Sequence, residues 1–244
     1  MAMNADTATR RIAKPLVFLL CLLPLGWLAA GILQWPPADL GANPVEKVQD
    51  TLGIWGLRFL LLTLAVTPLR EWFRWPRLLA FRRMLGLFAF AYIALHFLWY
   101  LFVDQAFDWR QLLADIAKRP YITLGFTALA LLAPLAWTST DRAMRRLGRR
   151  WQRLHRLVYP AAVLGCVHFW WQVKADIREP LFYAAVAALL LGWRLQRHWR
   201  RRIASSRSAA IAPGTRCERD AGQDQDSAGA GAPARLLAEQ PPAQ

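Results

Sequence analysis

Long apolar stretches separated by short charged ones dominate this sequence. A bilayer core about 30 Å thick needs about 20 helical residues to cross it, since no backbone polar group can stay unpaired in lipid. The stretches that qualify run from Leu16 to Leu33, Leu52 to Leu69, Met84 to Val103, Tyr121 to Trp137, Leu154 to Trp171 and Pro180 to Leu195. Because the connections are short, the pattern predicts an all-α polytopic membrane protein, a six-transmembrane-helix bundle with antiparallel neighbours.

The charges give this bundle a direction. Hydrophobic residues make up 56% of the chain, against roughly 45–50% in soluble proteins, and the net charge is +15. The positive residues gather at alternate span ends, in the regions 10–14, 70–83, 142–156 and 194–207. Because positive loops stay inside, both termini are predicted to be cytoplasmic. The charge is thus a topology signal, and no nucleic-acid partner is expected.

The chain divides into parts by composition. Residues 1–15 are predicted to be a cytoplasmic N-terminal segment, 16–199 the transmembrane domain and 200–244 a disordered cytoplasmic tail, because the end of the chain is rich in Ala, Ser, Gly, Pro and Gln. Arg10-Arg11 before an apolar run also fits a cleaved export signal, but no clean Ala-x-Ala site follows.

Two histidines inside the spans are the main candidates for chemistry. His96 lies thirteen residues beyond Arg83, and His168 lies twelve beyond Arg156. Both rings therefore lie about 18–20 Å along parallel helices. Facing imidazoles at one depth suit a noncovalent haem, and the absence of a CxxCH motif makes it b-type. Because both axial positions of its iron would be occupied, such a haem would have no open site for oxygen or substrate and would carry electrons. The alternatives are interhelical hydrogen bonds or a proton relay in a haem-free transporter.

The other basic residues are weaker candidates for contacts with a haem or a flavin. His155, flanked by Arg153 and Arg156, is either an interfacial histidine or a ligand of a second haem. His198 is interpreted as a headgroup contact. Arg58 either snorkels or binds a haem propionate. Arg82 and Arg83 are possible propionate or flavin contacts, although topology charges are the simpler interpretation.

Several motifs in order resemble one known family. They are Asn43-Pro44-Val45-Glu46, Leu64-Ala65-Val66-Thr67-Pro68-Leu69, Arg82-Arg83-Met84-Leu85-Gly86-Leu87 leading to His96, Arg119-Pro120-Tyr121-Ile122-Thr123-Leu124-Gly125, and the segment 147–159 leading to His168. Over about residues 10 to 200 the chain resembles the MsrQ (YedZ) family, the haem-binding membrane subunit of the bacterial protein-methionine-sulfoxide reductase system, within the ferric-reductase-like transmembrane group.

The resemblance implies a division of labour. The membrane subunit, with heme b and FMN, would pass electrons from the quinone pool to a periplasmic molybdopterin-containing MsrP-like catalytic subunit, which repairs oxidised methionine in envelope proteins. Sulfoxide reduction would then belong to the partner. Two-haem members of the wider group place two histidines on each of the third and fifth spans, whereas here the position paired with His155 holds Arg82 or Arg83.

Two rival functions remain open from the sequence. A stand-alone transmembrane ferric or flavin reductase would normally carry a fused nucleotide-binding domain, and this chain shows none. A proton-coupled transporter would use the histidines without haem and would be colourless when purified.

Overall fold

The structure is a computed structural model that describes residues 9–173 and 176–211. Within these ranges it is helical, without a strand. The long helices are α2 (Lys14–Ile32), α3 (Pro44–Trp72), α4 (Leu79–Trp99), α6 (Pro120–Trp137), α9 (Val158–Gln172) and α10 (Arg178–Ile211). Shorter ones are α5 (Trp109–Lys118), α7 (Asp141–Leu147) and α8 (Arg149–Leu154). The prediction of an all-α chain is confirmed over the described residues.

Among the residues that the structure describes, four helical stretches are long and apolar enough to cross a membrane. They are Arg11–Ile32, Pro44–Trp72, Pro76–Asp104 and Pro120–Trp137, which correspond to the first four predicted spans. The fifth predicted span is not one continuous α-helix, because a 3-10 helix, His155–Leu157, lies between the end of α8 and the start of α9. Helix α9 has 15 residues, fewer than the roughly 20 that a straight crossing needs.

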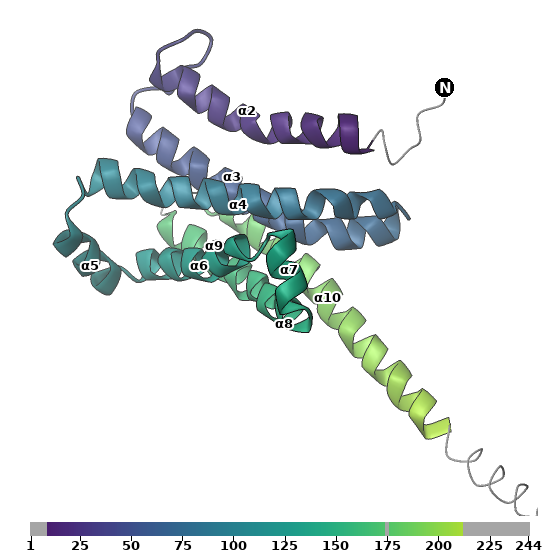
Figure 1. Cartoon of the computed structure of the whole chain (residues 1–244). Helices are drawn as coiled ribbons and strands as arrows, with labels where there is room; N and C mark the ends of the chain where they lie inside the picture. Colours follow the sequence, from purple (N-terminus) through teal and green to yellow (C-terminus); the bar gives the residue numbers. More distant parts are fainter. Residues whose placement is uncertain (1–8, 174–175, 212–244) are drawn as a thin grey trace, which may run out of the picture. The chain divides into compact units, whose positions relative to one another are not determined.

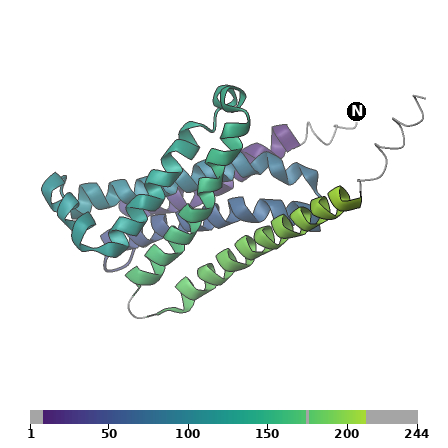
Figure 2. The ribbon, with the colours of Figure 1, turned by 90° about the horizontal axis from the view of Figure 1, so that it is seen from below.

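The helices that matter most for the site pack in two pairs. Helix α3 lies along α4, and α6 lies along α9, as both ribbon views show (Figures 1 and 2). Helices α3 and α4 approach each other closely at Gly56, where a Cβ atom would lie only 2.6 Å from the Ile93 side chain. Small residues at 0% exposure, Ala89 on α4 and Ala161 on α9, occupy the centre of the bundle. Close helix packing at small residues is the usual arrangement in membrane bundles.

Three short helices occupy loops that the sequence analysis left without structure. Helix α5 is preceded by Asp108, whose side chain accepts hydrogen bonds from the amides of Arg110 and Gln111. Helix α7 is preceded by Thr140, whose hydroxyl accepts a hydrogen bond from the amide of Ala143. Polar caps of this kind satisfy amides that a helix start leaves unpaired. Helix α5 buries Leu112 and Asp115 against the bundle.

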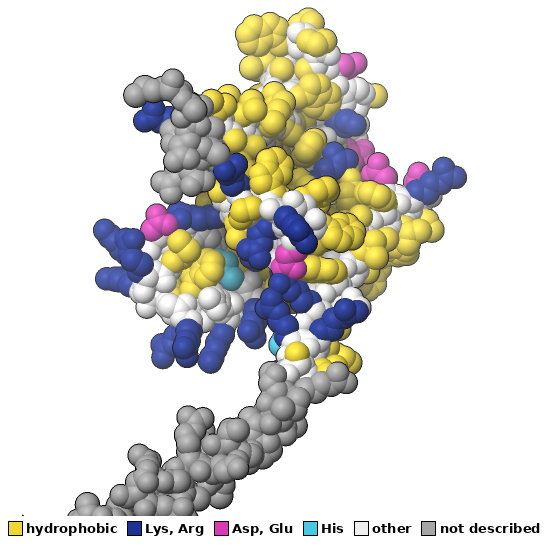
Figure 3. Space-filling view, turned by 90° about the vertical axis from the view of Figure 1, so that its right-hand side faces the viewer, with side chains coloured by type: hydrophobic (Ala, Val, Ile, Leu, Met, Phe, Trp, Pro, Cys, Tyr) yellow, Lys and Arg dark blue, Asp and Glu magenta, His cyan; other side chains and the backbone are white. Residues whose placement is uncertain are grey.

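Arginines gather at one end of the bundle, where α3 ends, α4 begins and α7 and α8 lie (Figure 3). Exposed members of this end are Arg74, Arg77, Arg83, Arg142, Arg145, Arg146, Arg149 and Arg150. Arg83 forms a salt bridge with Asp141, which links the start of α4 to α7. The clustering agrees with the charge pattern used to predict the cytoplasmic side.

The chain forms two units, Met1–Trp193 and Arg194–Gln244. The described part of the second unit is helical through Ile211 as the last part of α10. Most of the predicted tail, 212–244, lies outside the described residues, as does the start of the predicted N-terminal segment.

Candidate cofactor-binding site

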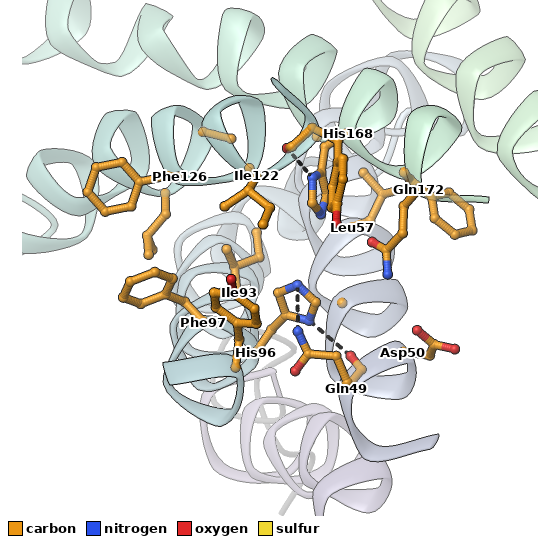
Figure 4. A pocket seen from close by; sticks show the side chains of 18 of the residues that line it. Gln49, Asp50, Leu57, Ile93, His96, Phe97, Ile122, Phe126, His168 and Gln172 are labelled. Carbon is orange, nitrogen blue, oxygen red and sulfur yellow. Dashed lines mark hydrogen bonds between the residues drawn. The ribbon is translucent and has the colours of Figure 1, made fainter. Parts of the chain in front are cut away.

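A cavity of about 600 Å³ lies between the two helix pairs, inside the first unit (Figure 4). This volume is within the range of cofactor sites. Its apolar walls come from all four helices and include Leu57, Leu60, Ile93, Phe97, Ile122, Phe126, Leu129, Leu132 and Phe169. Polar residues lining it include Gln49, Asp50, His96, Tyr100, Asp104, Gln105, Gln111, Asp115, Arg119, Tyr121, His168, Gln172, Asp176 and Glu179.

His96 enters the cavity from α4 and is fixed by α3. Its Nδ1 lies 2.9 Å from the backbone carbonyl oxygen of Gln49. A carbonyl can only accept, so this contact assigns the ring proton to Nδ1. The Nε2 atom keeps its lone pair and lies 3.4 Å from the side-chain amide nitrogen of Gln49. His96 thus presents an unprotonated ring nitrogen to the cavity.

His168 is held in the same way by the other helix pair. It projects from α9, and its Nδ1 donates to the backbone carbonyl of Tyr121 on α6 over 2.7 Å. The proton is again on Nδ1, so Nε2 is the atom available to a ligand. A metal-bound histidine usually donates its second nitrogen to a backbone carbonyl or carboxylate, which orients the ring and raises its basicity.

The two rings meet across the cavity. Their centres are 6.2 Å apart and their planes are inclined by 81°. A metal bound by one nitrogen of each ring at about 2 Å requires ring centres about 6 Å apart. In the described residues no group of three or more His, Cys, Asp or Glu side chains is placed to hold a metal ion. The spacing of the two rings fits a haem whose iron both histidines would hold.

A polar cluster borders the same cavity beside α5. Asp115 is only 8% exposed. Its carboxylate accepts hydrogen bonds from the Tyr100 hydroxyl at 2.9 Å and the Gln105 amide at 3.0 Å, and forms a salt bridge of 3.3 Å with Arg119. A hydrogen bond to the Tyr121 hydroxyl and then the charge of Asp115 raise the pKa of Arg119, so this side chain stays cationic.

Comparison with known proteins finds a matching family model and similar relatives. A family model described as "Ferric reductase like transmembrane component" matches residues 52–166. A relative from Xanthomonas campestris pv. campestris (strain 8004) is 49% identical over 206 residues, covering 83% of this chain and 94% of the relative. A relative from Rhodospirillum rubrum is 54% identical over 193 residues, covering 79% and 91%. Both carry the name "Protein-methionine-sulfoxide reductase heme-binding subunit MsrQ".

The chain belongs to the MsrQ family. A transmembrane family model and the long apolar helices together identify a membrane protein. The resemblance inferred from the sequence motifs is confirmed by these relatives.

The other residues of interest in this MsrQ-family chain lie away from the cavity. Arg58 donates from Nε to the Tyr183 hydroxyl at 2.8 Å and stacks over the Trp55 ring at 4.8 Å. It is not among the residues that line the cavity, and neither are Arg82 and Arg83. Along α4, thirteen residues separate Arg83 from His96, which is about 20 Å.

His155 also lies outside the cavity. Its ring stacks on Trp151, with 3.8 Å between centres, and its Nδ1 lies 3.1 Å from the Trp151 carbonyl. Trp151 in turn donates to the carbonyl of Thr138. His198 belongs to the second unit. The histidine pair predicted from matched depth is thus brought together, and neither His155 nor His198 lines the cavity.

Sequence reasoning missed the residues that orient the pair. Backbone carbonyls leave no signature of their own in a sequence, so neither Gln49 nor Tyr121 was predicted to orient a histidine. Arg119 appeared only within a family motif, although it is the one arginine among the described cavity-lining residues. Of the glycines beside the rings, Gly125 appeared only within the same motif and Gly53 was not mentioned.

Proposed function

We propose that this chain is the b-type haem subunit of a protein-methionine-sulfoxide reductase system, carrying electrons through the membrane. Its relatives are named heme-binding subunits of such a reductase. The observation that carries the proposal is the pair His96 and His168, with each Nδ1 bound to a carbonyl and ring centres 6.2 Å apart. That arrangement supports axial ligation through the two Nε2 atoms.

When bound, a bis-histidine haem supplies reversible one-electron transfer without an open coordination site. The chain's own residues would position it. His96 and His168 hold the ring nitrogens in place, and the apolar walls from Leu57 to Phe169 exclude water. Arg119 is the described cation placed to balance a propionate, because it lines the cavity and stays charged.

The proposal includes six spans. Helices α9 and α10 would add two crossings to the four apolar stretches, and the arginine-rich end would face the cytoplasm together with both termini. The haem-binding domain would cover 16–199, between an N-terminal segment and a cytoplasmic tail at 200–244. The membrane would be the bacterial inner membrane, with the cavity in its periplasmic half.

Electron donor and acceptor follow from the family resemblance. Quinol would supply electrons, and a periplasmic molybdopterin-containing MsrP-like subunit would accept them and reduce methionine sulfoxide. The loops at 36–47, 104–118 and 172–179 would form the docking surface on that side.

FMN is also proposed from the family resemblance. Arg82 and Arg83 are the cationic candidates for its phosphate, at a position separate from the histidine cavity, which they do not line.

A pyridine haemochrome assay with parallel flavin extraction on the purified protein tests this function. We expect b-type haem, and the haem-to-protein ratio distinguishes one haem from two, the second of which would require His155. A colourless protein would instead support the proton-coupled transporter. Reduction of ferric ions by the isolated chain, without a partner, would support the stand-alone reductase.

A further inference from the structure

The two histidines are seated by the same local arrangement on two different helices. The His96 contact to Gln49 and the His168 contact to Tyr121 each span 47 residues of chain. In each case a glycine follows four residues after the accepting carbonyl: Gly53 on α3 and Gly125 on α6. In an α-helix that carbonyl already receives the glycine amide, so the imidazole uses its second lone pair.

The glycines are what let the rings approach. A Cβ at Gly53 would lie 3.0 Å from Nδ1 and 3.1 Å from Cε1 of His96. A Cβ at Gly125 would lie 2.9 Å from the same two atoms of His168. Any other residue would therefore push the ring away from the carbonyl one turn earlier. The space used by each imidazole is the space that a side chain would fill.

The sequence carries the same repetition. Thr51-Leu52-Gly53 recurs as Thr123-Leu124-Gly125, and His96-Phe97-Leu98-Trp99 recurs as His168-Phe169-Trp170-Trp171. Both recurrences have an offset of 72 residues, which is also the offset between the carbonyl residues Gln49 and Tyr121. The fully buried Ala89 and Ala161 are related by that offset as well. The pairs α3/α4 and α6/α9 thus share sequence and contacts at equivalent positions.

We infer that Gly53 and Gly125, at equivalent positions of the two helix pairs, are positioning residues that set the orientation and hydrogen bonding of the two imidazoles. This inference rests on the proposed haem function. The carbonyl contact and the glycine beside each ring fix the two ring planes at 81° to one another. They also keep each Nδ1 proton on a carbonyl, which makes the imidazole a stronger donor to iron and favours the ferric state.

The test compares the wild-type protein with Gly53→Ala and Gly125→Ala, using haem content, ferric EPR and a spectroelectrochemical midpoint potential. Near-perpendicular imidazoles give a strongly anisotropic low-spin EPR signal, which we expect for the wild type. Either substitution should weaken the hydrogen bond, raise the midpoint potential and change the EPR anisotropy, in the same direction for both. Gly86→Ala is the matched control, because its Cβ would meet only Thr63, at an ordinary 3.6 Å.

The outcomes separate the two claims. A wild-type protein without haem would overturn the proposed function. A haem-loaded wild type with the EPR signal of parallel imidazoles would overturn the inference, and this measurement needs no variant to fold. So would glycine variants that keep the wild-type potential and signal. Loss of haem from Gly53→Ala and Gly125→Ala, with haem retained in Gly86→Ala, would support the inference.

Discussion

His96 and His168 face each other across one cavity with their ring centres 6.2 Å apart and their planes nearly perpendicular. They come from α4 and α9, which belong to different helix pairs, and each is tied to the partner helix of its own pair. The distance between them therefore depends on how the two pairs pack. This relationship makes the pair sensitive to substitutions in either half of the cavity.

Removing either ring should abolish the proposed haem site. In His96→Ala or His168→Ala one axial ligand is lost, so the reducible b-type spectrum of purified membranes should disappear. His198→Ala should keep it, because this residue does not line the cavity. Optical difference spectra with equal amounts of protein make the comparison. Wild-type haem content and redox response in either ligand variant would contradict the assignment.

Arg119 should tune the potential of the haem. Arg119→Gln removes a positive charge that lines the cavity, so the ferric form gains relative stability and the midpoint potential should fall. At an exposed site screened by salt, one charge is worth on the order of tens of millivolts. Potentiometric titration at low and high salt measures the shift. Arg110→Gln, on the same side but not lining the cavity, is the control and should leave the potential unchanged.

Tyr92 should stabilise the bundle independently of the haem. Its side chain is fully buried, and its hydroxyl donates to the Cys21 carbonyl at 2.7 Å, which joins α4 to α2. Tyr92→Phe removes one buried hydrogen bond, worth about 1 kcal/mol. The melting temperature in detergent, followed by circular dichroism, should fall by about 2–4 °C. Tyr92→Ala should cost about 3–5 kcal/mol because it also leaves a cavity. A Phe variant as unstable as the Ala variant would refute the hydrogen-bond explanation.

Flavin and haem should be separable by substitution. Arg82 and Arg83 do not line the histidine cavity, and Arg83 pairs with Asp141. The double variant Arg82→Gln/Arg83→Gln should therefore lose extractable FMN and retain the b-type spectrum. Asp141→Asn, which removes only the partner of an exposed ion pair, should change stability by less than about 1 kcal/mol and leave FMN in place. Simultaneous loss of haem and FMN in the double variant would place the arginines at a shared site.

The sequence by itself determined the class of molecule, and it predicted that His96 and His168 face each other. Lipid leaves backbone groups no partner outside a helix, so apolar length alone predicted the spans from Leu16 to Trp137. Counting along parallel helices put His96 and His168 at one depth, because the rise per residue is constant. The same counting treated the segment from Leu154 as one α-helix, whereas the structure has a short 3-10 helix, His155–Leu157, before α9 begins.

Only the tertiary structure decided which way the rings face and what holds them. Depth follows from one helix at a time, whereas orientation depends on the neighbour that supplies a carbonyl, and Gln49 and Tyr121 act through backbone atoms that every residue possesses. The same packing places the Arg58 side chain in hydrogen-bonding contact with Tyr183, and it places Arg119 in the lining of the cavity. The long apolar stretches specify helices through local hydrogen bonding, but the site arises from contacts between helices, which depend on the shapes of both surfaces at once.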